Sequence, residues 1–198
     1  MASVHDVINS FRDSSSTSEQ GTQFEQLMVR WFELDPTLNE QYDQVWRWPD
    51  WPGRHNHGDN GIDIVAHVAE TGPEFGTPDE FAAIQCKFYD PEHHLAKSDI
   101  DSSFTEFGKA PFTRRVIIST ADKWRKNAEA ALEGQQIPVT RISMKDLEDS
   151  PVSWDIAWPK NTLQVDLAPK KPHTLRPHQE EAVDIETASM RSPPPARN

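Results

Sequence analysis

Apolar and polar residues follow one another along this chain with two spacings, one typical of helices and one of strands. An amphipathic helix is predicted over residues 19–34, because five apolar residues recur at i, i+3, i+4, i+7 and i+8: Phe24, Leu27, Met28, Trp31 and Phe32. Pro36 is expected to end it. Period-two alternation and short apolar runs predict strands at 43–48, 61–66, 81–88, 116–119 and 139–142. Further helices are predicted at 4–11, 97–108, 122–132 and 144–147.

The order of these elements predicts a layered α/β domain, because strands and helices alternate after residue 95. Residues 49–60 are predicted to form a loop. Residues 70–80, rich in glycine and proline, are predicted to form a long hairpin connection. The chain of 198 residues can hold one ordinary domain plus an extension. We therefore expect a domain over 1–158, followed by a proline-punctuated linker and a second, incomplete segment over 159–198.

The polar positions on two of the predicted strands suggest a site. Side chains alternate between the faces of a strand, so Asp63 is expected on the face opposite Ile62 and Ile64. Gln85 and Lys87 share a face, while Cys86 points into the core. If the two strands pair, a carboxylate, an amide oxygen and an ammonium converge, which suits a divalent metal held against a phosphodiester. The alternative is that Asp63 ends a turn and Lys87 extends from the edge of a sheet.

These residues also carry a resemblance to a known family. The chain resembles the Mrr-like branch of the PD-(D/E)xK nucleases at residues 61–66 (Gly-Ile-Asp-Ile-Val-Ala) and 85–87 (Gln-Cys-Lys). Glu25 on the upstream helix and the later strands at 115–120 and 138–142 also fit this family. The resemblance spans roughly residues 20–150. It implies a restriction-endonuclease-like three-layer fold, in which helices flank a central mixed β-sheet, and an Mg²⁺-dependent endonuclease that hydrolyses DNA.

The resemblance also implies roles for individual residues. Asp63 would be the principal metal ligand, and Lys87 would contact the scissile phosphate or position the attacking water. The Gln85 side chain, the backbone carbonyl of Cys86 and Glu25 would complete the metal site. The chain departs from the family at Gln85, where most members have an acid, so Glu25 is the natural replacement for the missing charge.

Charge changes this picture only locally. The chain has 20 basic and 32 acidic residues, a net charge of −12, which is unusual for a nucleic-acid enzyme. A basic stretch nevertheless runs from residue 109 to 126 and is a candidate for contact with the phosphate backbone, the alternative being a solvated helix face. Trp46 and Trp48 are expected to have structural roles. The candidate DNA-binding residues are Arg54, His55, Lys109, Arg114, Arg115, Lys123, Arg125 and Lys126.

The single cysteine, Cys86, excludes an internal disulfide framework and is compatible with a reducing cytoplasm. No apolar run has the length of a membrane span, and the first residues lack the pattern of a signal peptide. We therefore expect a soluble cytoplasmic protein.

A second resemblance lies at residues 174–182, Thr-Leu-Arg-Pro-His-Gln-Glu-Glu-Ala. This string is similar to the opening of superfamily 2 helicases and translocases, in which the residue matching Gln179 recognises adenine. No phosphate-binding Gly-Lys-Thr or Gly-Lys-Ser loop follows, so ATP is expected to serve only an attached translocase. A nuclease ahead of a translocase resembles the N-terminal part of Type ISP restriction-modification enzymes. The implied partners are double-stranded DNA and the rest of a longer polypeptide with translocase, methyltransferase and target-recognition domains, in defence against phage.

Other functions fit the sequence less well. Residues 55–57 (His-Asn-His) lack the ββα pattern of an HNH nuclease, and His93 and His94 lack the spacing of a zinc site. A Ser/His/Asp hydrolase would need a nucleophile elbow, which is absent. The main alternative is a catalytically silent DNA-binding or docking module that regulates an attached translocase, which the acidic charge and the neutral Gln85 favour.

Overall fold

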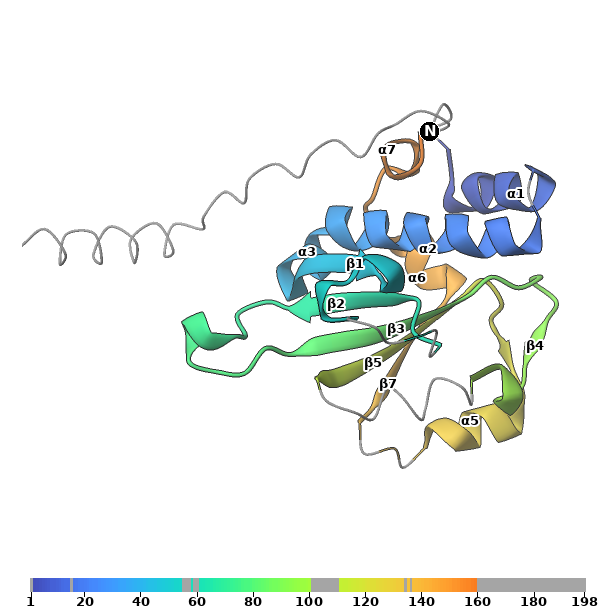
Figure 1. Cartoon of the computed structure of the whole chain (residues 1–198). Coiled ribbons are helices and arrows are strands. Elements are labelled where there is room, and N and C mark those ends of the chain that lie inside the picture. Colours follow the sequence, from blue (N-terminus) through green and yellow to red (C-terminus); the bar gives the residue numbers. More distant parts are fainter. Residues whose placement is uncertain are drawn as a thin grey trace, which may run out of the picture. The chain divides into compact units, whose positions relative to one another are not determined.

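A computed structural model describes residues 2–14, 16–54, 58, 61–100, 111–133, 135 and 137–159. His55, Lys109 and the whole of 160–198, with Gln179 and most of the predicted linker, lie outside the described residues. Within them, helices cover both faces of a mixed sheet (Figure 1). This arrangement confirms the predicted three-layer α/β fold. None of the described helices is both long and apolar enough to cross a membrane.

The central sheet has five strands in the order β1-β2-β3-β5-β7. Strands β1, β2 and β3 pair antiparallel, whereas β5 runs parallel to both β3 and β7. A second sheet of two parallel strands, β4 and β6, lies apart from it. The strands are β1 (Tyr42–Arg47), β2 (Ile64–Val68), β3 (Phe81–Lys87), β4 (His94–Leu95), β5 (Phe112–Ser119), β6 (Lys123–Trp124) and β7 (Val139–Ile142).

Helices α1 and α2 lie on one face of the sheet and α5 on the other (Figure 1). Short 3₁₀ turns, η1 (Trp48–Asp50) and η2 (Pro52–Arg54), follow β1, and η3 (Pro73–Phe75) lies in the β2–β3 hairpin. Residues 97–100 are also helical. The α-helices are α1 (Val4–Ser14), α2 (Thr17–Leu34), α3 (Pro36–Gln41), α5 (Lys126–Leu132), α6 (Met144–Asp149) and α7 (Trp154–Ala157).

The largest core lies between the sheet and α2. All five apolar residues of the predicted α2 stripe are buried there, together with Ile64, Ala82 and Ile84 from the facing side of the sheet. A smaller cluster on the opposite face of β2 and β3 contains Trp48 and Trp51, with Trp46 packed against it. The structural role expected for Trp46 and Trp48 is therefore confirmed. A third cluster packs α5 against β5.

The junction of α2 and α3 depends on Asp35, which is only 6% exposed. Its Oδ1 accepts hydrogen bonds from the backbone N–H groups of Thr37 and Leu38 at the start of α3. Its Oδ2 accepts a hydrogen bond from the Ser150 hydroxyl, which in turn accepts one from the Trp31 indole. Pro36 therefore ends α2, as predicted, and also begins α3, which was not predicted.

Two further differences from the predicted elements are local. Residues 122–132 were predicted to be one helix, but Lys123 and Trp124 form β6, which pairs with β4, and the helix begins at Lys126. Helix α7 was not predicted. The predicted strand at 139–142 has the bounds of β7, and the predicted edge strand at 43–48 corresponds to β1, which lies at one edge of the sheet.

Candidate active site

The Asp63 carboxylate lies against the backbone of β3. Asp63 directly precedes β2, and its Oδ2 accepts a hydrogen bond of 2.7 Å from the backbone N–H of Cys86. Its own N–H donates to the carbonyl of Ile84, while its carbonyl accepts from the N–H of Trp48 on the other side. The acid is therefore fixed at the Gln85–Lys87 triplet, which agrees with the predicted convergence of the two segments.

The strand alternation used to place Asp63 does not extend to Ile62. Ile62 was expected on the face of Ile64, but it is buried in the tryptophan cluster on the opposite face. The regular β2–β3 register ends at the pair Ile64–Ile84, and Gly61 has a φ of +81°, which favours glycine. Residues 61–63 lie outside the regular ladder. The Asp63 carboxylate therefore accepts the hydrogen bond from the Cys86 N–H, which a backbone carbonyl of the neighbouring strand would normally accept.

Gln85 contributes a buried oxygen. The residue is 2% exposed, and its Oε1 is the one buried side-chain polar atom without a hydrogen-bond partner among the described residues. An unsatisfied buried oxygen costs about 1–3 kcal/mol. Such an atom in a folded protein is an acceptor available to an ordered water, a ligand or a cation.

Lys87 ends β3 and lies opposite Ser119 in the parallel register with β5. Its carbonyl accepts a hydrogen bond from the backbone N–H of Thr120. Burial lowers the pKa of the Lys87 ammonium, while the charges of Asp63 and Asp99 oppose that shift. Lys87 therefore lies in a partly desolvated position within reach of two acidic charges.

Cys86 has the role expected of a strand residue. Its side chain packs against the α2 core, and burial, followed by the charges of Asp63 and Glu25, raises the thiol pKa well above its ordinary value. A neutral buried thiol is a poor nucleophile. The part of Cys86 available to the site is its backbone.

Glu25 lies on the α2 side of the sheet. Its Oε2 forms an ion pair of 3.1 Å with Nε of Arg47, at the end of β1, and its charge reaches Cys86. Ala83 belongs to the tryptophan cluster, and Gln85, two residues later on β3, points to the same face of the sheet. Glu25 therefore lies on the face of the sheet opposite Gln85.

The basic residues of the 109–126 stretch fall into two groups. Lys123, Arg125 and Lys126 are exposed and follow the carboxyl end of β5, next to the end of β3 that carries Lys87. Lys123 also forms an ion pair with Glu92. These three residues lie at the end of the sheet where the candidate site lies.

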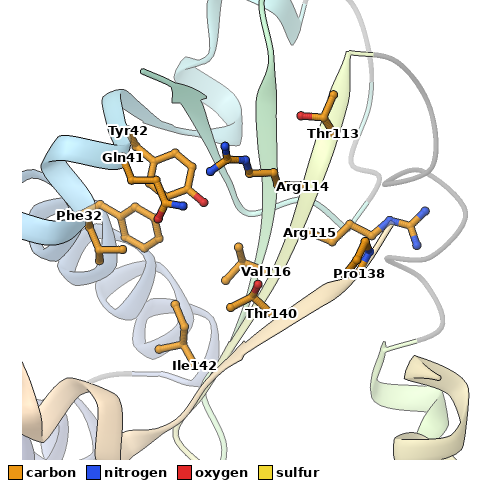
Figure 2. Close-up of a pocket in the computed structure, with 11 residues that line it drawn as sticks. Phe32, Gln41, Tyr42, Thr113, Arg114, Arg115, Val116, Pro138, Thr140 and Ile142 are labelled. Carbon is orange, nitrogen blue, oxygen red and sulfur yellow. The ribbon is translucent and has the colours of Figure 1, made fainter. Parts of the chain in front are cut away.

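Arg114 and Arg115 lie near the other end of β5. The Arg114 guanidinium lies over the Tyr42 ring, 5.8 Å from its centroid, while Arg115 is buried and donates a hydrogen bond to Gln135. Figure 2 shows the two side chains pointing in opposite directions, with Arg114 beside a pocket of about 280 Å³ between α3, β5 and β7. Burial lowers the pKa of Arg115. Neither residue is near the Asp63–Lys87 site along β5.

Arg54 lies over the Trp48 ring, with its guanidinium carbon 5.8 Å from the centroid. The Trp48 indole donates a hydrogen bond to the carbonyl of Gly58. Arg54 therefore extends from the tryptophan cluster next to the segment that leads to Asp63. A guanidinium stacked on an aromatic ring is held in one orientation at little entropic cost.

Within the described part of the chain, no three His, Cys, Asp or Glu side chains form a metal-binding cluster. This is consistent with a site built from one carboxylate, one amide oxygen and one backbone carbonyl. Nε2 of His93 lies 3.1 Å from Oδ2 of Asp99. Asp99 was not identified from the sequence, because its relation to Lys87 depends on how the segment after β3 folds back.

Comparisons with known proteins concern the family and the fold of the chain. Residues 33–164 match the Mrr-type family described as restriction endonuclease. A Type ISP restriction-modification enzyme, LlaBIII, described as ATP-dependent and bound to DNA, is 28% identical over 96% of this chain, with a TM-score of 0.64. The chain spans 11% of the length of that enzyme. No curated protein matches the sequence.

Two further solved structures are similar to 72% of this chain. MspJI restriction endonuclease, in complex with a 27-mer oligonucleotide, is 15% identical with a TM-score of 0.49, and the match covers 29% of it. The modification-dependent restriction endonuclease AspBHI is 14% identical with a TM-score of 0.46, and the match covers 33% of it. Since the family match covers most of the strands and the site segments from Asp63 to Lys87, the chain belongs to the restriction endonuclease family.

Proposed function

We propose that this chain is an Mg²⁺-dependent endonuclease module that hydrolyses DNA phosphodiester bonds within an ATP-driven restriction-modification enzyme. Family membership supports a nuclease, and the similarity to a Type ISP enzyme over 96% of the chain supports the larger context. The observation that carries the chemistry is the contact between the Asp63 carboxylate and the Cys86 N–H, beside the unpaired oxygen of Gln85.

These groups fit a hard divalent cation. Asp63 supplies a charged oxygen, and Gln85 supplies a buried neutral oxygen without a protein partner in the described chain. The Cys86 carbonyl is a third oxygen from the same triplet, and Mg²⁺ in proteins prefers a few such ligands together with water. Glu25 is also proposed for this site, although it is paired with Arg47 and lies on the face of the sheet opposite Gln85. When bound, Mg²⁺ would make a water more acidic and neutralise charge on the phosphate.

The protein residues have separate tasks in this proposal. Lys87 binds the scissile phosphate or orients the attacking water, because its ammonium lies within reach of the charges of Asp63 and Asp99. The hydrogen bond from the Cys86 N–H holds the Asp63 carboxylate against β3. Preorganised charges of this kind stabilise the negative charge that develops during phosphoryl transfer.

Contact with DNA is proposed for the exposed basic residues at the same end of the sheet, Lys123, Arg125 and Lys126, and for Arg54. These residues would neutralise phosphates and set the register of the duplex. His55 and Lys109 remain proposed contacts that lie outside the described residues. Arg114 and Arg115 remain proposed contacts too, although they lie at the other end of β5 and Arg115 is buried.

A catalytically silent module is the second candidate function. It is favoured by the net charge of −12 and by the neutral Gln85 at the position where most members of the superfamily carry an acid. In that case the domain would bind DNA or dock an attached translocase, and ATP, the residue Gln179 and the remaining domains would belong to that longer polypeptide.

Cleavage of supercoiled plasmid distinguishes the two functions. The chain, alone and within its parent polypeptide with ATP, is incubated with plasmid in Mg²⁺ or in EDTA. We expect Mg²⁺-dependent cleavage that Asp63→Asn and Lys87→Ala abolish. Asp63→Asn is chosen because it retains an acceptor for the Cys86 N–H.

Matched controls are Asp50→Asn and Lys145→Ala, which change exposed residues of the same types. Both controls are expected to cleave as the unaltered protein does. Cleavage retained in Asp63→Asn or Lys87→Ala would refute the assignment of the site. DNA binding without cleavage in either Mg²⁺ or Mn²⁺ would favour the silent module.

A further inference from the structure

The chain leaves β3 through residues 88–89, which are held by the segment that follows β5. The Thr120 hydroxyl accepts a hydrogen bond of 2.8 Å from the backbone N–H of Tyr89 and donates one of 2.6 Å to the Tyr89 carbonyl. The backbone N–H of Thr120 donates to the Lys87 carbonyl at 3.0 Å. The side chain of Thr120 therefore continues the β3–β5 ladder beyond its last pair, Lys87–Ser119.

Thr120 is itself held firmly. It is only 3% exposed, and its neighbours Ser119 and Ala121 are buried as well. The Ser119 hydroxyl accepts a hydrogen bond of 3.0 Å from the backbone N–H of Ala121, which closes the turn at the end of β5. Buried polar groups whose hydrogen bonds are made rigidify their surroundings. Thr120 is thus a fixed support for the end of the neighbouring strand.

Helix α1 holds the same two residues from the α2 side of the sheet. Nη2 of Arg12 donates a hydrogen bond of 2.7 Å to the Tyr89 carbonyl, so this carbonyl accepts from both Arg12 and Thr120. The Arg12 guanidinium carbon lies 5.0 Å from the centroid of the Phe88 ring. Phe88 in turn packs on Phe24 of α2, at a centroid distance of 5.5 Å.

We propose that Thr120 and Arg12 are positioning residues, which hold residues 88–89 from two sides and thereby keep Lys87 in place at the end of β3. The catalytic part of this role rests on the proposed nuclease function. Chain segments at the ends of elements open more readily than their centres, so a lysine at the last position of a strand depends on what holds the residues after it. A displacement of about 1 Å in a reacting group is enough to cost roughly a hundredfold in rate.

The first test observes the backbone of Lys87 and does not require cleavage. Amide hydrogen exchange of the 198-residue chain is measured by NMR in Thr120→Val, which keeps the shape of the side chain and removes the hydroxyl. The amide at position 120 donates to the Lys87 carbonyl and is expected to lose about tenfold in protection, because the end of β3 moves away from it. Thr120→Ser retains the hydroxyl and should keep the protection of the unaltered protein.

Two controls separate this local effect from a general loss of stability. The amide of Asp63 donates to the Ile84 carbonyl on the other edge of β3 and should keep its protection in Thr120→Val. Thr113→Val makes the same chemical change at an exposed threonine near the start of β5 and should leave the amide at position 120 unchanged.

Arg12→Met tests the second contact and is the milder variant should Thr120→Val fail to fold. The replacement keeps an apolar chain over the Phe88 ring and removes the donor to the Tyr89 carbonyl. Protection at position 120 is expected to fall by less than in Thr120→Val, because the Thr120 hydroxyl remains. Arg30→Met, at an exposed arginine of α2, is the matched control.

The second test measures single-turnover DNA cleavage by the parent polypeptide. Thr120→Val is expected to lower the rate roughly tenfold to a hundredfold with little change in DNA affinity, because the Thr120 hydroxyl is buried against the Tyr89 backbone. Thr120→Ser is expected to restore the rate. A purely structural role would change stability without slowing the reaction of bound DNA.

The outcomes separate the two proposals. Unchanged protection at position 120 in folded Thr120→Val overturns the positioning role, and so does unchanged protection in Arg12→Met if Thr120→Val does not fold. An unchanged cleavage rate in folded Thr120→Val, in a protein that does cleave DNA, also overturns it. Absence of cleavage in the unaltered protein counts against the nuclease function alone, since protection at position 120 still decides whether Thr120 and Arg12 hold the end of β3.

Discussion

The unpaired oxygen of Gln85 makes a quantitative prediction about stability. Replacing Gln85 by Met retains the length of the side chain and removes the orphaned oxygen. Removing the unpaired oxygen removes its desolvation penalty and stabilises the folded state by about 1–3 kcal/mol, whereas losing the amide nitrogen as a hydrogen-bond donor destabilises it by about 1 kcal/mol. In EDTA we therefore expect Gln85→Met to be more stable by about 1 kcal/mol, or about 3 °C in Tm.

Mg²⁺ is expected to cancel this difference in stability if Gln85 is a metal ligand. At tenfold excess over its Kd, a ligand that binds only the folded state stabilises it by about 1.4 kcal/mol. A tenfold weaker site in Gln85→Met would gain only about 0.4 kcal/mol under the same conditions. The difference between the two proteins should therefore vanish or change sign when Mg²⁺ is added.

Urea unfolding followed by tryptophan fluorescence measures both quantities, since the chain has seven tryptophans. Gln44→Met, a substitution of an exposed glutamine on β1, is the matched control and should respond to Mg²⁺ as the unaltered protein does. A Gln85→Met protein that is less stable in EDTA would refute the idea that the oxygen lacks a partner. Equal stabilisation by Mg²⁺ in both proteins would refute its role as a ligand.

Three other predictions concern the fold and the proposed DNA surface. Asp35→Ala should lower the free energy of unfolding by about 2 kcal/mol, because it removes a helix cap and a buried acceptor, whereas Asp35→Asn should lose less; urea unfolding measures both. Hydrogen bonds from Ser143 lower the pKa of Asp146, so the folded state binds fewer protons and this stabilisation is lost as the pH falls below about 4. Asp146→Asn should therefore show a flatter loss of stability in acid than the unaltered protein, and a parallel pH dependence would contradict the assignment. Arg125→Ala and Lys126→Ala should weaken DNA binding equally for unrelated sequences and reduce the salt slope by about 1 each, as measured by fluorescence anisotropy against the control Lys145→Ala.

The sequence predicted the elements whose signal is local. The α2 stripe follows from a helical repeat of apolar residues, and β7 from a short β-branched run, so both were found with nearly the observed bounds. The approach of Asp63 to the segment of Gln85 and Lys87 was predicted because the two segments are neighbours along the chain, and the catalytic roles of these residues stay predictions.

The features that were missed depend on contacts between distant segments. Residues 123 and 124 form a strand only because β4 lies beside them, so a helix was predicted instead. Ile62 was assigned to the wrong face because period-two alternation was extended past the end of the ladder. Asp99 could not be connected to Lys87 from sequence, because that relation requires the chain to turn back after Tyr89.

The parallel pairing of β3 with β5 has a consequence for synthesis of the protein. Parallel neighbours cannot be joined by a tight turn, so Lys87 acquires its partner Ser119 only after a long segment has been made and closed into a loop. We therefore expect a nascent chain that ends before β5 to form the β2–β3 hairpin while the other edge of β3, including the backbone of Lys87, still lacks its neighbour.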